Sequence, residues 1–222
     1  MPLPRIAVLA SGRGSNLQAL LDAIGGGRLQ AQVAGVFSDR PDAPALQRVP
    51  PPLRWSADAR AFPDRAAFDD ALGDAVAACA PDWIFCAGYM RILGEAFVRR
   101  FEGRLLNVHP SLLPRYKGLH THARALQAGD AEHGASVHFV VHELDAGAVV
   151  AQVRIPVLPG DTPDALAARL LPEEHRLVVA VMGLAVAGRL SERDGQVHVD
   201  GQCLFRPLQL DSRGVLLAES HG

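Results

Sequence analysis

The first half of the chain alternates short, continuous apolar runs with segments in which apolar residues recur at helical spacing. The run RIAVLA at 5–10 is almost unbroken and ends in Ser11-Gly12, which is typical of a strand buried on both faces. The segment 15–24 follows with leucines at helical spacing, and the glycines 25–27 end it. Strands that alternate with helices predict an α/β fold around a doubly wound, mostly parallel central sheet.

The same alternation predicts the further elements. The expected strands are 5–10, 33–37, 83–88, 104–108, 136–141 and 148–157. The expected helices are 15–24, 63–79, 95–101 and a long helix from Thr162, its N-cap, towards residue 187 with a kink at Pro172. The proline-rich segment 41–56 is predicted to be largely loop. The tail 188–207 is predicted to form two short strands of an antiparallel C-terminal extension.

Length, charge and cysteine content restrict the class of protein. The 222 residues suit one domain, 1–222, rather than two full ones. The 22 Lys and Arg nearly balance the 24 Asp and Glu, which argues against nucleic acid or an acidic membrane as the main partner. An apolar run of 18 residues is absent, so we expect no membrane span. The N-terminus lacks signal-peptide features and three cysteines are too few for a disulfide framework, so we expect a cytoplasmic protein.

The turn SGRGSN joins the first expected strand to the first expected helix. Glycines in such a turn let a ligand approach the backbone N–H groups closely, and the N-terminus of the helix favours a bound anion. We therefore predict that Gly12–Asn16 holds a phosphate monoester, with the side chains of Ser15 and Asn16 as additional donors.

The stretch LLNVHPSLLP, 105–114, contains the end of a buried strand with two polar residues. Two prolines then restrict the backbone that follows. Asn107 and His109 are two residues apart, so both side chains point to the same side if the strand continues. Asp145 lies in a loop of the second half, where its carboxylate could meet the imidazole, favour the imidazolium and fix its orientation. An amide N–H can hold an oxyanion and an imidazole can carry a proton. The three side chains therefore suit acyl transfer to an external amine without a covalent acyl-enzyme.

Other interpretations of these residues stay open at this point. The glycines could serve only the geometry of the turn, and Asn107 and His109 could be hydrogen-bonded structural residues. A dinucleotide site is partly matched, because Asp39 lies where a ribose-binding acid would, but Leu17 replaces the third glycine. A zinc site would draw on His120, His122, His138, His142 and Asp145, but no paired ligand motif anchors them.

Six longer motifs carry a resemblance that runs almost from end to end. They are IAVLASGRGSNLQAL (6–20), AGYMRIL (87–93), GRLLNVHPSLLP (103–114), HTHARAL (120–126), SVHFVVHELDAG (136–147) and EEH (173–175). In these motifs the chain resembles the glycinamide ribonucleotide formyltransferases, which are folate-dependent enzymes of purine synthesis. The pattern N-x-H-P-S-L-L-P is shared by enzymes that use formyltetrahydrofolate, whereas SGRGSN points to the glycinamide ribonucleotide branch.

The resemblance implies a site in three parts. Asn107 would hold the formyl oxygen and the oxyanion, and His109, paired with Asp145, would relay protons. The substrate-binding residues that the resemblance implies are Gly12, Arg13, Gly14, Ser15 and Asn16 for the phosphate and Glu174 for the ribose. The folate-binding residues that it implies are Arg65, Met90, Arg91, Ile92, Leu93, Asn107, Val141, His142, Glu143, Leu144 and Asp145.

The resemblance also implies a reaction and an organisation of the chain. The formyl group of 10-formyltetrahydrofolate, the co-substrate, would pass to the amine of phosphoribosyl-glycinamide, without a metal. The fold would be the Rossmann-like formyltransferase fold, with the nucleotide phosphate bound by 1–108 and the folate by 109–222. We expect small-molecule substrates, no nucleic-acid or membrane partner, and a monomer or weak homodimer. The alternative function is a formyltetrahydrofolate hydrolase or another sugar-amine formyltransferase.

Overall fold

The computed structural model describes residues 2–218 of the chain. The chain divides into two compact units, Met1–Asn107 and Val108–Gly222. The glycine turn lies in the first unit, and the loop that carries Asp145 lies in the second. In the described part of the chain, no helix has the length and apolar character that a membrane crossing requires.

A parallel sheet forms the centre of the first unit. Its strands are β1 (Arg5–Leu9), β2 (Gln32–Ser38), β3 (Arg54–Ser56), β4 (Trp83–Cys86) and β5 (Leu105–His109), in the order β5-β4-β1-β2-β3. Every neighbouring pair in this order is parallel. The carboxyl ends of the strands therefore meet at one edge.

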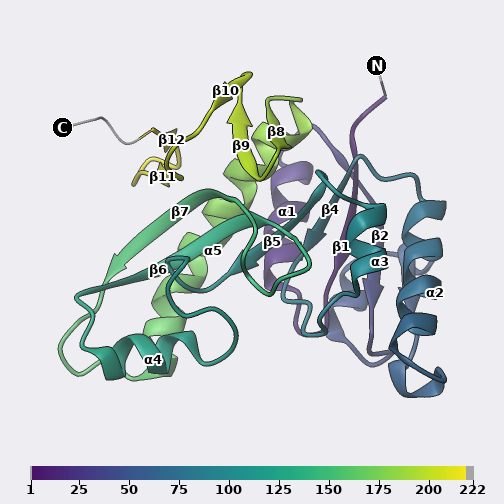
Figure 1. Cartoon of the computed structure of the whole chain (residues 1–222), viewed down its shortest axis with the longest axis horizontal. Coiled ribbons are helices and arrows are strands. Elements are labelled where there is room, and N and C mark those ends of the chain that lie inside the picture. The colour runs from purple at the N-terminus through teal and green to yellow at the C-terminus, as the bar shows by residue number, and fades with distance from the viewer. Residues whose placement is uncertain (1, 219–222) are drawn as a thin grey trace. The chain divides into compact units, whose positions relative to one another are not determined.

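Helices cover both faces of this sheet. They are α1 (Ser15–Gly25), α2 (Arg65–Ala78) and α3 (Glu95–Arg100). Figure 1 shows α1 on one face and α2 and α3 on the other, which confirms the doubly wound arrangement. Leu17 and Leu20 of α1 and Phe68 and Leu72 of α2 are completely buried. Burial of each such side chain stabilises the fold by roughly 1.5–3 kcal/mol, so apolar packing holds the helices on the sheet.

The second unit is built on a mixed sheet. Its strands are β6 (Glu132–Phe139), β7 (Val149–Pro156), β11 (Leu208–Leu210) and β12 (Leu216–Leu217), in the order β12-β11-β7-β6. The pairs β6–β7 and β11–β12 are antiparallel, whereas β11 and β7 are parallel. A separate antiparallel sheet contains β8 (Leu190–Arg193), β9 (Gln196–Val199) and β10 (Gln202–Cys203). This small sheet confirms the predicted antiparallel extension.

A long helix, α5 (Pro163–Val186), packs against β6, β7 and the short helix α4 (Thr121–Ala128). Figure 1 shows α5 crossing the two long strands of the second unit. The Thr162 hydroxyl accepts the N–H of Ala165 at 3.2 Å, which confirms the predicted N-cap. The helix continues through Pro172, and its buried residues, among them Leu166, Leu170 and Leu177, form the apolar stripe that faces the strands.

The structure differs from the sequence-based expectations in several short elements. The segment 41–56 is not largely loop, because it holds the 3-10 helices Pro44–Arg48 and Pro51–Leu53 and the edge strand β3. Helix α4 was not expected, and neither were β10, β11 and β12. These elements are at most eight residues long, too short for a periodic pattern to identify. β6 also begins at Glu132 rather than 136, because two polar residues there pair with β7.

We expect the substitution Gly147→Ala to destabilise the second unit, because a Cβ at this position would lie 1.8 Å from the carbonyl oxygen of Phe139. A backbone oxygen at the end of β6 cannot move aside, so the free energy of unfolding should fall by about 3 kcal/mol or more. Urea denaturation measures this loss.

Gly183→Ala in α5 is the matched control, since a Cβ there meets nothing within 4 Å. Alanine favours a helix, so the control should be as stable as the unmodified protein or slightly more stable. Equal stability of the two variants would contradict the steric argument.

Candidate active site

The glycine turn of the first unit leads from β1 directly into α1. Gly14 has φ +70° and is the N-cap of α1. A Cβ at Gly14 would lie 2.7 Å from the Cβ of Ala45, whereas a Cβ at Gly12 would meet nothing within 4 Å. Gly14 is therefore required by backbone conformation and by close packing. Gly12, in contrast, borders open space at the N-terminus of the helix, where an anion is favoured.

Two side chains give this turn its polar character. Asn16 is only 8% exposed, and its side-chain oxygen has no partner among residues 2–218. Arg48, which the sequence analysis missed, donates from Nε to the carbonyl oxygen of Arg13 at 2.8 Å and from a terminal nitrogen to Gln18 at 2.7 Å. The guanidinium thus fixes the turn and brings a positive charge to it. Arg48 lies 35 residues after Arg13 in the chain, so no local motif in the sequence indicated this contact.

The segment Gly88–Leu93 lies beside the glycine turn. The N–H of Ser11 donates to the carbonyl oxygen of Gly88 at 3.2 Å, and the N–H of Met90 donates to the Ser11 hydroxyl at 2.9 Å. Met90 is 65% exposed and Ile92 is 52% exposed, so the segment presents apolar side chains to solvent. The loops that follow β1 and β4 thus meet at the same edge of the sheet. Such an apolar edge suits a flat ligand.

The two arginines assigned to the folate differ in their surroundings. The guanidinium of Arg91 lies 4.9 Å from the centre of the Phe68 ring, which is cation–π geometry. Arg65 is about half exposed, and its Nε lies 3.5 Å from the buried carboxylate of Asp69. Arg65 is thus a tethered side chain rather than a freely solvated charge, and its contact with folate stays a prediction.

Asn107 lies at the carboxyl edge of the parallel sheet. The strand registers pair Leu9 with Cys86 and Cys86 with Asn107, so the three residues form one row. Asn107 therefore stands level with the end of β1, where the glycine turn begins. Because β5 extends from Leu105 to His109, alternation within the strand puts Asn107 and His109 on the same face.

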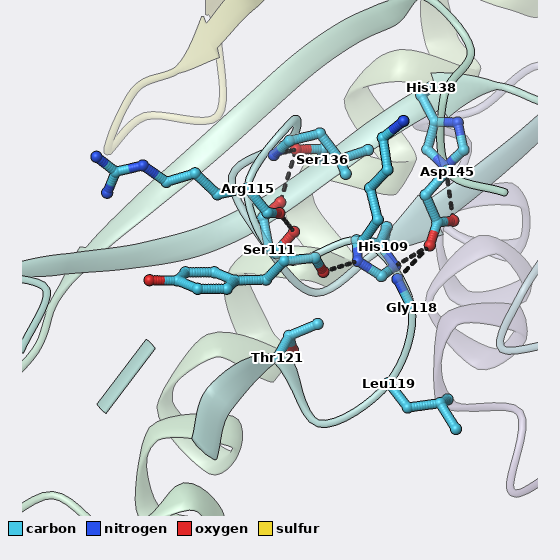
Figure 2. Close-up of polar contacts among 12 residues, drawn as sticks. His109, Ser111, Arg115, Gly118, Leu119, Thr121, Ser136, His138 and Asp145 are labelled. Atoms are coloured by element: carbon cyan, nitrogen blue, oxygen red, sulfur yellow. Dashed lines mark hydrogen bonds and ion pairs between the residues drawn. The ribbon is translucent and has the colours of Figure 1, made fainter. Parts of the chain in front are cut away.

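His109 and Asp145 lie side by side in the second unit, as Figure 2 shows. Nδ1 of the imidazole lies 3.4 Å from Oδ2 of the carboxylate, and both side chains are less than 10% exposed. Nε2 donates to the backbone carbonyl oxygen of Tyr116 at 2.9 Å, since a carbonyl can only accept. Burial lowers the pKa of His109, and this effect outweighs the contacts with Tyr116 and Asp145 that act to raise it. Asp145 thus acts in the direction predicted from the sequence, towards the imidazolium, but burial has the larger effect.

Three polar groups surround the carboxylate of Asp145. Oδ2 accepts the N–H of Gly118 at 2.8 Å, and Oδ1 lies 3.6 Å from Nε2 of His138 (Figure 2). Burial works to raise the pKa of Asp145, but His138, the Gly118 amide and His109 together lower it, so the carboxylate form is favoured. The backbone of Asp145 has φ +49°, a region that non-glycine residues rarely adopt. The loop is held in a strained conformation that keeps the carboxylate among its donors.

His138 was considered in the sequence analysis only as a zinc ligand. The structure instead places it on β6, where Nδ1 is 2.8 Å from the carbonyl oxygen of Phe139 and Nε2 faces Asp145. His138 therefore faces the carboxylate oxygen that His109 does not contact. In the described residues, no three His, Cys, Asp or Glu side chains are grouped so that they could hold a metal ion.

The remaining assigned residues of the second unit lie on α5 and on the loop after β6. Glu174 is on α5 and is 9% exposed. Val141 is 41% exposed and Leu144 is 48% exposed, and Glu143 forms an ion pair with Lys117 at 3.0 Å. His142 is exposed on the same loop. This loop therefore presents apolar side chains next to the buried carboxylate.

Comparisons with known proteins were made with this geometry in hand. A family model described as Formyl transferase matches residues 4–182. A phosphoribosylglycinamide formyltransferase of Escherichia coli (strain K12) is 46% identical over 201 residues, which cover 90% of this chain and 95% of that protein. The trifunctional purine biosynthetic protein adenosine-3 of Homo sapiens is 38% identical over 83% of this chain and 18% of its own length.

Solved structures agree with these relatives. The phosphoribosylglycinamide formyltransferase of Coxiella burnetii, in complex with CHES, has a TM-score of 0.86 and 42% identity, covering 91% of this chain and 96% of its own. A formyltetrahydrofolate deformylase from Pseudomonas syringae pv. tomato has a TM-score of 0.77 but only 24% identity, so it shows the fold alone. The predicted Rossmann-like formyltransferase fold is confirmed by these matches.

We expect the stability of the protein to fall as the pH falls from about 6.5 to about 4. Burial lowers the pKa of His133 from 6.5 to about 4. Between these values the unfolded chain binds a proton that the folded chain does not, so the free energy of unfolding decreases by up to roughly 3 kcal/mol. Burial also lowers the pKa of His109 and of His122, whose ring lies 4.9 Å from that of His133, and both act in the same direction.

Urea denaturation at about pH 7 and about pH 4.5 measures this dependence. His133→Phe should reduce it, because the phenyl ring keeps the packing and cannot be protonated. His198→Phe, in β9, is the matched control and should leave the dependence unchanged. A His133→Phe variant with the full pH dependence would show that other groups cause it.

Proposed function

Because the chain belongs to the formyl transferase family and, within it, to the phosphoribosylglycinamide formyltransferases, we propose that it formylates the amine of phosphoribosyl-glycinamide. The formyl donor is 10-formyltetrahydrofolate, and the products are formylglycinamide ribonucleotide and tetrahydrofolate. The chain is thus a folate-dependent transferase of de novo purine biosynthesis. The observation that carries the mechanism is the buried His109–Asp145 pair. His109 follows Asn107 by two residues in β5, so the imidazole and the amide lie on the same face of the strand.

We assign the catalytic roles to Asn107, His109 and Asp145. The amine nitrogen of the ribonucleotide attacks the formyl carbon, the carbonyl oxygen becomes an oxyanion, and the bond from carbon to N10 of the folate breaks. The side-chain N–H of Asn107 stabilises the oxyanion. His109 takes the proton from the attacking amine and returns it to the departing N10, so the proton count balances.

The surroundings of His109 support its role as the base. Burial favours the neutral imidazole, which is the form that can accept a proton. In the structure Nε2 donates to Tyr116, so a substrate reaches this nitrogen only when the Tyr116 carbonyl is displaced. The ring proton then moves to Nδ1, against Asp145, and Nε2 is left as the base. The low pKa of Asp145 keeps its charge available to stabilise the imidazolium that forms.

The substrate phosphate is assigned to the glycine turn and the ribose to Glu174. Open space at Gly12 and the N-terminus of α1 support the phosphate assignment, and the side-chain NH2 group of Asn16 is a further donor. Gly14 shapes the turn, and the exposed Arg13 adds charge beside it. The remaining residue assigned to the phosphate is Ser15.

The folate is assigned to segments of both units. In the first unit, the exposed apolar side chains of Gly88–Leu93 suit contact with a flat pterin ring. In the second unit, the exposed Val141 and Leu144 of the loop after β6 have the same character. The residues assigned to the folate are Arg65, Met90, Arg91, Ile92, Leu93, Asn107, Val141, His142, Glu143, Leu144 and Asp145.

Four further properties belong to this proposal. The chain 1–222 works as one formyltransferase domain, in which 1–108 binds the nucleotide phosphate and 109–222 the folate. Its partners are the two small-molecule substrates, and the nearly balanced charge supports the exclusion of nucleic acid and of membranes. The protein acts in the cytoplasm, as a monomer or weak homodimer.

The reaction is tested by mixing the protein with 10-formyltetrahydrofolate, with and without the ribonucleotide. Tetrahydrofolate should form only with the ribonucleotide, whereas release without it would identify a hydrolase. Asn107→Ala and His109→Ala should each lower kcat by a factor of about a hundred to ten thousand. His198→Ala is the matched control and should retain the full rate. Unchanged rates in both site variants would refute the assignment.

The phosphate site is tested by Asn16→Asp, which places a negative charge at the N-terminus of α1. We expect the KM for the ribonucleotide to rise by a factor of about ten or more through repulsion of the phosphate, while the KM for the folate stays within about twofold. Gln30→Glu introduces the same charge beyond the far end of α1 and should change neither constant. A change in the folate KM alone would contradict the assignment.

A further inference from the structure

Two buried side chains hold the ends of the segment Gly88–Gly94, most of which is assigned to the folate. Ser11, which follows β1, accepts the N–H of Met90 at 2.9 Å. Asp69, on α2, accepts the N–H of Gly94 at 2.8 Å. Ser11 is 3% exposed and Asp69 is 4% exposed, so neither side chain faces solvent. The segment is therefore fixed near its start and at its end by groups from two other elements.

The hydroxyl of Ser11 is oriented so that its oxygen can accept the N–H of Met90. It donates its proton to Oδ1 of Asp39 at 2.6 Å, because a carboxylate can only accept a hydrogen bond. Its lone pairs are then available to the N–H of Met90. The N–H of Ser11 also donates to the carbonyl oxygen of Gly88 at 3.2 Å. Ser11 thus makes contact with the segment through both its backbone and its side chain.

Asp69 binds the other end of the segment, at Gly94, where there is no space for a side chain. A Cβ on Gly94 would lie 2.6 Å from Oδ2 of Asp69, so only glycine lets the carboxylate approach this N–H. The same oxygen lies 3.5 Å from Nε of Arg65. The other oxygen, Oδ1, is buried and has no hydrogen-bond partner in the described residues. A buried carboxylate with an unpaired oxygen is costly for folding, so stability alone does not account for it.

We propose that Ser11 and Asp69 are positioning residues for the folate, which they do not touch. They keep Met90–Leu93 in one conformation, so that the backbone groups and apolar side chains between the two anchors are ready for the pterin. Asp69 also orients Arg65, another residue assigned to the folate. Without an anchor, folate binding has to order the segment and loses affinity accordingly. This inference rests on the proposed function, because it takes Met90–Leu93 as part of the folate site.

The proposal is tested by titrating Ser11→Ala and Asp69→Ala with tetrahydrofolate and, separately, with the ribonucleotide in a calorimeter. The Kd for tetrahydrofolate should rise roughly five- to tenfold in each variant, the scale of one lost hydrogen bond. The Kd for the ribonucleotide should stay within about twofold for Asp69→Ala. At saturating folate, kcat should stay within about threefold, because the reacting groups are unchanged.

Conservative and matched variants separate positioning from a general structural effect. Asp69→Asn keeps an oxygen that can accept the N–H of Gly94, so it should restore most of the folate affinity. Asp70→Ala, the exposed neighbour on α2, and Ser56→Ala, exposed in β3, should behave as the unmodified protein. The effect of Ser11→Ala with Asp69→Ala should be smaller than the sum of the two, since both anchors act on one segment.

Three results would overturn the proposal. They are a folate Kd within twofold of the unmodified protein in Ser11→Ala, an equal loss of both ligands in Asp69→Ala, or no recovery in Asp69→Asn. If Asp69→Ala does not fold, Ser11→Ala decides the question alone. An unmodified protein that neither binds tetrahydrofolate nor transfers the formyl group would refute the proposed function itself, before any variant is made.

Discussion

The carboxylate of Asp145 is the acceptor on which the geometry of the second unit depends. It is met by His109 on one side, His138 on another and the backbone N–H of Gly118, and its own backbone has φ +49°. Burying a carboxylate is unfavourable unless polar partners surround it, and here these partners also lower its pKa. The loop after β6, the turn at Gly118 and the end of β5 are therefore held together by one negative charge. Removing that charge would leave an imidazole and a strained loop without a common partner.

Much of this arrangement follows from local patterns in the sequence. The unbroken apolar run before Ser11 and the helical spacing after it predicted β1 and α1 almost to the residue. The spacing of Asn107 and His109 predicted their common face, because the pattern needs only one regular strand. The hairpin-like loop between two apolar runs led to Asp145, and its contact with His109 confirms that interpretation. Features that depend on a single helix or strand, or on two consecutive ones, could therefore be predicted from the sequence.

Other parts of the site depend on contacts between distant segments, which no local pattern contains. Ser11 and Met90 are 79 residues apart, and Asp69 and Gly94 are 25 apart, yet each pair is joined by a hydrogen bond. The lowered pKa of His109 was also missed, because the sequence shows its acidic neighbour but not the depth of its burial. Short elements such as β3 and α4 were missed for a related reason, since packing rather than periodicity stabilises them.

The carbonyl oxygen of Tyr116 has a consequence for how selectively the formyl donor is used. While it accepts the proton on Nε2, the imidazole of His109 has no free nitrogen facing outward, because Nδ1 is turned towards Asp145. Under the proposed function, a water molecule beside bound formyl folate would meet no unprotonated nitrogen at Nε2 until the Tyr116 carbonyl moved away. Hydrolysis of the formyl donor in the absence of the ribonucleotide would then be slow.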